Sequence, residues 1–200
     1  MPTDPRPTPP SAHVATPEEV GLEEFRQLRA TIRERSTARV VVSVITFVSW
    51  AALALVLHHW DESMVCGLIP LVVLIVGFEL MFALHVGVER IGRYVAVFYE
   101  GPPQAPKWET AIAAFGRSVA AKATQTHPLL AGEFIVATGL NLVVLVVAVQ
   151  PDPYVSSLSI AMAVIHGAFI TRVALARRQA ARQREADTAV FRAIAQDLGR

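Results

Sequence analysis

The sequence predicts an all-α integral membrane protein: an up-down bundle of four transmembrane helices with cytoplasmic helical extensions and an amphipathic interfacial helix. Of the 200 residues, 53% are hydrophobic and only 18% are charged, and the mean hydropathy is +0.43. An ordinary soluble domain has about 25% charged residues. This composition therefore argues against a soluble globular domain and against a disordered chain. Four long apolar runs and a one-sided distribution of Lys and Arg support the same class.

The apolar runs have the length of membrane-spanning helices. A helix needs about 20 residues to cross a hydrocarbon layer of about 30 Å. The runs do not alternate in polarity, as barrel strands would. We expect spans at 40–60, 64–99, 132–150 and 154–198, where the second and fourth continue into the cytoplasm.

The N-terminal segment divides into a tail and a helix. Residues 1–17 contain six prolines, so we expect a disordered tail over 1–16, with a polyproline ligand as the alternative. Thr16, Pro17 and Glu19 form a helix start, which predicts a cytoplasmic amphipathic helix over 17–39. Apolar stripes on the cytoplasmic segments predict packing on one another or docking of another protein. The C-terminal stripe consists of Val190, Phe191, Ile194 and Leu198.

The basic residues predict the orientation. All 18 Lys and Arg residues lie in the N-terminal segment, in the loop between Arg90 and Lys122, or from Arg172 onward. The positive-inside rule then places both termini and the middle loop in the cytoplasm. We expect a multi-pass protein of the cell inner (plasma) membrane, with Trp60 and Tyr154 at the outer interface.

The cytoplasmic loop, 100–130, contains an amphipathic helix over 106–122. Lys107, Arg117 and Lys122 lie on its other face. The helix could lie in the headgroup region or could cover the cytoplasmic helices, and the sequence favours neither. Its apolar residues recur at helical spacing: Trp108, Ile112, Phe115 and Val119.

Three polar residues fall deep within the spans. Counting 1.5 Å per residue from the outer ends places Glu79, Asn141 and His166 at depths of about 21, 14 and 17 Å. They could therefore form one intramembrane cluster that handles protons or a ligand, or hydrogen bonds that join helices. The second interpretation is favoured, because a proton path usually needs several carboxylates and only Glu79 lies deep.

Two further patterns concern helix faces. His85 and Glu89 are four residues apart near the cytoplasmic boundary and could pair.

Small residues recur at every fourth position in the last span and predict close approach of a helix from this chain or another copy. This helix-packing ridge consists of Ser159, Ala163, Gly167 and Thr171.

Function is the least determined property. Cys66 is the single cysteine, so neither a disulfide framework nor a cysteine-based zinc site is expected. No catalytic motif is present, and we expect no enzyme activity, cofactor or metal.

The basic residues suit anionic headgroups at the cytoplasmic face of the bilayer and not nucleic acid. The first hypothesis is a structural or accessory membrane subunit that forms a homo-oligomer or joins a larger complex. The alternative is a small transporter or channel built around Glu79.

Overall fold

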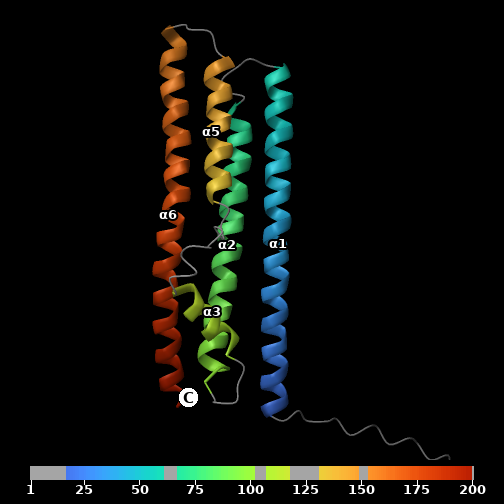
Figure 1. The fold of residues 1–200 in the computed structure, drawn as a ribbon, viewed down its shortest axis with the longest axis vertical. Coiled ribbons are helices and arrows are strands. Elements are labelled where there is room, and N and C mark those ends of the chain that lie inside the picture. Colours follow the sequence, from blue (N-terminus) through green and yellow to red (C-terminus); the bar gives the residue numbers. More distant parts are fainter. Residues whose placement is uncertain (1–16, 61–66, 102–106, 118–130, 149–152, 200) are drawn as a thin grey trace, which may run out of the picture.

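The computed structural model describes residues 17–60, 67–101, 107–117, 131–148 and 153–199. These residues fold as helices, and none of them is in a β-strand, which confirms the all-α class. The predicted tail, 1–16, lies outside the described residues. The helices are α1 (Pro17–Trp60), α2 (Leu68–Phe98), α3 (Trp108–Arg117), α5 (Ala131–Ala148) and α6 (Pro153–Asp197) (Figure 1).

Two helices run the full length of the molecule. α1 has 44 residues and α6 has 45, so each is about 66–68 Å long at 1.5 Å per residue. Neither helix contains a proline after its first residue. Each therefore continues without a break from its apolar half into its charged half. α6 ends at Asp197, and Gly199 just after it has a φ of 69°, which suits glycine.

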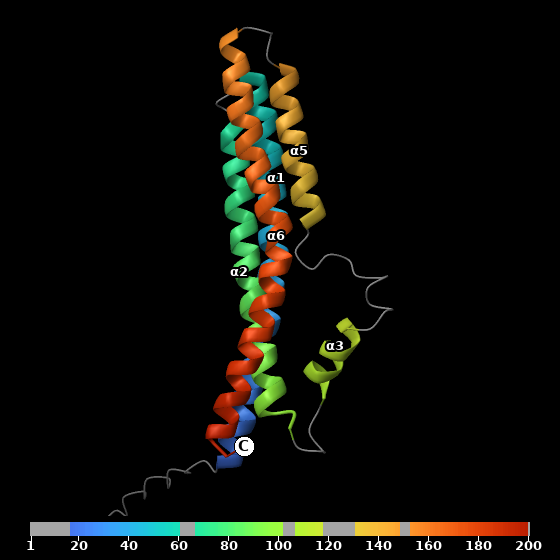
Figure 2. The same cartoon turned by 90° about the vertical axis from the view of Figure 1, so that its left-hand side faces the viewer.

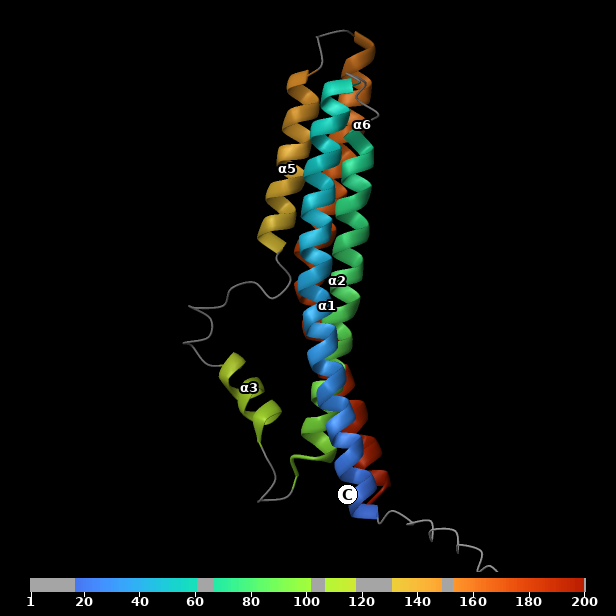
Figure 3. The same cartoon turned by 90° about the vertical axis from the view of Figure 1, so that its right-hand side faces the viewer.

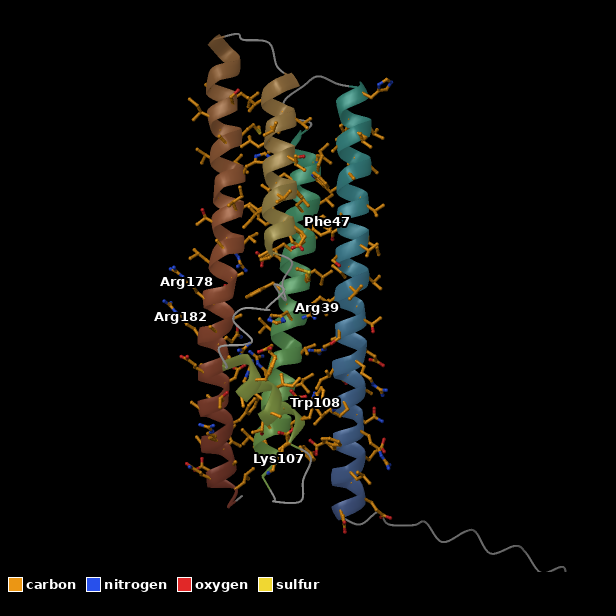
Figure 4. All side chains as sticks on the ribbon, in the orientation of Figure 1. Arg39, Phe47, Lys107, Trp108, Arg178 and Arg182 are labelled. Carbon is orange, nitrogen blue, oxygen red and sulfur yellow. The ribbon has the colours of Figure 1, made fainter. Side chains whose placement is uncertain are left out.

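The apolar half of the molecule is a four-helix bundle centred on α2. α2 packs against α1, α5 and α6. Phe78 of α2 is fully buried, and its ring centroid lies 5.3 Å from that of Phe134 in α5 and 5.9 Å from that of Phe169 in α6. The ring centroid of Phe47 in α1 lies 4.9 Å from that of Phe134, and Figure 4 labels Phe47. Aromatic contacts thus join all four helices at one level.

Gly77 explains how closely α1 and α2 approach. A Cβ atom at this position would lie 2.8 Å from the Thr46 Cβ atom and 2.2 Å from its Oγ1 atom. Real Cβ atoms do not approach their neighbours so closely. The absence of a side chain at Gly77 is therefore required for the observed packing.

The surface of the apolar half is unlike that of a soluble protein. Large apolar side chains are exposed along all four helices, for example Val48, Val76, Val136 and Val164. α1, α2 and α6 are long and apolar enough to cross a membrane, and α5 is a shorter apolar helix. These features support a helical membrane protein.

The charged half contains the continuations of three long helices together with α3. α1, α2 and α6 continue side by side, and an aromatic cluster joins them near their ends. Phe191 of α6 packs against α2, whereas Val190, Ile194 and Leu198 of the predicted stripe are exposed. α3 lies on the same side of the bundle as α5 (Figures 2 and 3). The aromatic cluster consists of Phe25, Tyr94, Phe98, Tyr99 and Phe191.

Candidate functional site

Asn141 is the centre of a polar network in the apolar half. Its Nδ2 atom donates to the Gly67 carbonyl at 3.0 Å and lies 3.0 Å from Nε2 of His166. Its Oδ1 atom accepts from Nε1 of Trp50 at 3.4 Å. Asn141 and His166 are both buried. One amide side chain therefore connects α5 with α1, with α6 and with the residue that precedes α2.

Donor and acceptor roles in this network are fixed by its outer members. The indole of Trp50 only donates and the Gly67 carbonyl only accepts, which orients the Asn141 amide. Nδ1 of His166 lies 2.7 Å from the Met162 carbonyl, so Nδ1 carries the proton and Nε2 accepts from Asn141. Every contact is satisfied by a neutral imidazole. The network thus has the composition of an interhelical hydrogen-bond junction.

Glu79 does not join this network, contrary to the expected three-residue cluster. Its Oε2 atom accepts from Nη2 of Arg172 in α6 at 2.8 Å. The Arg172 guanidinium also lies 4.9 Å from the ring centroid of Phe82 and 5.7 Å from that of Phe78. These are cation–π distances. Arg172 directly follows the uncharged run of the last predicted span, so the sequence pattern groups it with the cytoplasmic basic residues and does not predict this contact.

The starting level of α2 explains the error. The depth count assumed that all spans begin at the same outer level. The contact with Asn141 instead places Gly67 seven residues, or about 10 Å, below the end of α5 at Ala148. Glu79 is twelve residues further along the chain, which adds about 18 Å. The count therefore succeeded for Asn141 and His166 and failed for Glu79.

His85 and Glu89 have different hydrogen-bond partners. Nδ1 of His85 lies 3.0 Å from Nη1 of Arg39 in α1. Glu89 is paired with Arg93, at 3.1 Å, and with Arg184 of α6, at 2.7 Å. The predicted boundary pair is therefore divided, so that one member contacts α1 and the other contacts α6.

Asp187 extends the ionic contacts between α2 and α6. It accepts from Arg93 at 2.8 Å and from Arg90 at 3.2 Å. Burial alone would raise the pKa of Asp187, but the hydrogen bonds and charges of Arg93 and Arg90 together outweigh burial and hold it below its usual value. Ionised Asp187 therefore stabilises the packing of α6 on α2 at neutral pH.

Glu100 holds α3 in place and was missed by the sequence analysis. It is buried just after α2, and its carboxylate accepts from the amides of Glu109 and Thr110 at 2.7 and 2.8 Å. It also accepts from the Thr110 hydroxyl at 2.6 Å. A carboxylate at a helix N-terminus satisfies free amides and favours the helix dipole. Capping from nine residues upstream leaves no local sequence signal.

Glu109 provides a second contact between α3 and the bundle. It pairs with Arg29 of α1 at 2.5 Å, and its side chain lies against Gly92, where a Cβ would meet its Oε2 atom at 2.8 Å. Burial raises the pKa of Glu109, and the charge of Arg29 opposes this shift. The polar side of α3 is thus the side attached to α1 and α2.

The apolar side of α3 is exposed. Trp108, Ile112 and Phe115 have exposed fractions of 58%, 50% and 63%. The fourth predicted member, Val119, lies outside the described residues. The structure therefore does not use this apolar face to cover the cytoplasmic helices.

The predicted ridge on α6 faces outward. Ala163, Gly167 and Thr171 are exposed, Ser159 is half-buried, and a Cβ at Gly167 would meet no atom within 4 Å. No helix among the described residues therefore packs closely at Gly167.

Within the described residues, no group of three or more His, Cys, Asp or Glu side chains could hold a metal ion. Comparisons found no matching protein-family model, curated protein or solved structure.

Proposed function

We propose that this chain is a non-enzymatic structural or accessory subunit of the inner membrane, which self-associates or joins a larger membrane complex. The observation that carries the proposal is the Asn141 junction, in which four polar contacts of the buried Asn141 and His166 side chains are satisfied within the bundle. Interhelical hydrogen bonds of this kind hold membrane bundles together. A bundle fixed in this way suits a scaffold.

The other polar groups of the apolar half support the same proposal over the transport alternative. The hydroxyls of Ser43, Thr46 and Thr138 donate to carbonyls of their own helices. Glu79 is bound to Arg172 and lies about 18 Å along α2 from the level of Asn141. A chain of titratable groups along the membrane normal, as a proton path needs, is therefore not formed by these residues.

The proposed topology has four spans with both termini in the cytoplasm. It is supported by the length of α5, 18 residues or about 27 Å, and by the restriction of Lys and Arg to the N-terminal segment, the middle loop and the C-terminal segment, which this topology places on one side. In a Cys66→Ser background, we expect His59→Cys to react with an impermeant maleimide from outside intact cells. Gly101→Cys should react only after lysis. The reverse labelling pattern would contradict the topology.

We also propose that the apolar face of α3 contacts the inner surface of the bilayer. Lys107 flanks this face, and Arg178 and Arg182 project outward from α6 (Figure 4). Such groups suit anionic headgroups. In vesicles, brominated lipids should quench the wild-type emission more than that of Trp108→Phe. Equal fractional quenching of the two proteins would place α3 away from lipid.

Assembly is tested by mass measurement after purification in a mild detergent. We expect an oligomer or a complex with a stoichiometric partner protein. A strictly monomeric particle with no co-purifying protein would contradict the proposed function. The transport alternative predicts instead that reconstituted vesicles conduct protons or ions and that Glu79→Gln abolishes this flux.

A further inference from the structure

The Glu79–Arg172 pair lies on the outer surface of the apolar half, between α2 and α6. The two side chains are 43% and 33% exposed. Their surroundings on this surface are apolar and also exposed. We define the α2–α6 face as Val72, Val76, Glu79, Ile165, Ala168, Arg172 and Leu175.

The pair lies in the part of the apolar half that is nearer to the charged half, about 28 Å below the outer end of α5 and close to the inner end of that helix. The next charged residue on α2 after Glu79 is Glu89, ten residues or about 15 Å further on. A charged side chain costs about 2.5–3.5 kcal/mol at the centre of a membrane helix and less toward its ends, so the cost at the level of this pair is smaller but still unfavourable. Mutual pairing offsets part of this cost, but lipid chains offer no hydrogen bonds to the exposed parts of either group. The face is therefore better satisfied by protein than by lipid.

We propose that a second copy of this chain covers the α2–α6 face, so that Glu79 pairs with the partner subunit's Arg172 as well as with its own. This inference deepens the self-association in the proposed function and depends on it. The face carries one carboxylate and one guanidinium side by side at the same depth. It is therefore complementary in charge to a copy of itself.

Two-fold symmetry about the membrane normal places Glu79 of each copy opposite Arg172 of the other copy. When two copies face each other across such an axis, α6 of one copy lies opposite α2 of the other. Glu79 and Arg172 are in contact, so the partner's groups lie at the same height as well. Small side chains on this side of α6, Ala161 and Ala168, are exposed and allow close approach. The result is a ring of four alternating charges.

Charge exchange distinguishes pairing between copies from pairing within one copy. We would express Glu79→Arg and Arg172→Glu with different affinity tags, separately and together, and compare them with the double exchange. Pairing between copies predicts that each single variant loses its homodimer and that co-expression restores a mixed dimer. We expect recovery of the mixed dimer to exceed that of either homodimer by about a hundredfold, because the mixed dimer forms two charge pairs between the copies and each pair contributes about tenfold, or about 1.4 kcal/mol.

The alternatives give different results. If the pair acts only within one chain, the double exchange restores stability but co-expression restores nothing, and the inference is wrong. If the wild-type protein is oligomeric and no exchange alters its assembly, this face is wrong while the proposed function stands. If the wild-type protein is a monomer without partners, both fail.

Cross-linking tests the face even if a charge exchange prevents folding. In a Cys66→Ser background, Val76→Cys places a thiol three residues from Glu79, on the proposed interface. Val136→Cys on α5 is the matched control, since both valines have an exposed fraction of 60%. A short bismaleimide should link Val76→Cys into a dimer and leave Val136→Cys as a monomer. Equal linking, or linking only at Val136, would overturn the inference.

Discussion

Replacing Glu100 should release α3 without unfolding the bundle. Glu100 is 4% exposed and accepts three hydrogen bonds from the first turn of α3, at 2.6 to 2.8 Å. α3 has only 10 residues, and an isolated helix of this length is marginal in water. Its helical state therefore depends on this carboxylate and on the Arg29–Glu109 pair.

The expected magnitude follows from these contacts. Loss of a capping side chain costs about 0.5–2 kcal/mol, and loss of a negative charge at a helix N-terminus costs about 0.3–1 kcal/mol more. For Glu100→Ala the sum is about 2 kcal/mol, which corresponds to about a 30-fold increase in local opening. Glu100→Gln keeps one acceptor oxygen but loses the charge, so its effect should be smaller, about 1 kcal/mol.

Hydrogen exchange followed by mass spectrometry measures this opening directly. Peptides from 108–117 should exchange faster in Glu100→Ala, while peptides from 68–98 should keep their protection. Glu100→Gln should fall between the wild type and Glu100→Ala. The reasoning is refuted if α3 keeps its protection in Glu100→Ala, or if α2 and α3 lose protection together.

Three further predictions concern the bundle. Gly77→Ala should lower the free energy of unfolding in detergent by about 1–3 kcal/mol, because the new Cβ would overlap Thr46 of α1. Gly139→Ala is the control: nothing lies within 4 Å of this position, so the same measurement should show an increase of about 0.5–1 kcal/mol. Alanine substitutions at Asn141 and His166 should show a coupling of about 0.6–1.7 kcal/mol in a double-mutant cycle, and additive effects would contradict their hydrogen bond. The pKa of Asp187 is lowered by Arg93 and Arg90, so its stabilising contribution is present at neutral pH and disappears as the pH falls through that lowered pKa. Asp187→Asn should therefore be less stable at pH 7 and lose less protection in the 177–197 segment on acidification, and parallel pH profiles would refute the assignment.

The sequence predicted those features that depend on chain composition over many residues. Apolar runs without a breaker predict long helices, and α1 and α6 are unbroken. The contact between Asn141 and His166 was also predictable. A short connection joins α5 to α6, so counting back from their shared end places both residues at similar depths.

The remaining features depend on spatial relations that no local pattern contains. The level of α2 relative to α5 is set by packing, so the depth of Glu79 relative to Asn141 could not be counted from the ends of the spans. Glu100 contacts amides of α3 that lie nine and ten residues further along the chain, beyond the reach of a local capping pattern. The division of His85 and Glu89 between α1 and α6 likewise requires partners from distant helices, Arg39 for His85 and Arg184 for Glu89.

The two polar groups of the apolar half differ in chemistry and in position, and this difference bears on how the protein assembles. The Asn141 network consists of neutral groups, so it can be enclosed within the bundle at little cost once every donor has an acceptor. A charged pair is costly to enclose and is costly to expose to lipid. Glu79 and Arg172 occupy the surface between α2 and α6, where a copy of the same chain can supply the missing opposite charges. The hydrogen-bond junction thus holds the helices of one chain together, and the charged pair marks the face at which we propose that a second copy binds.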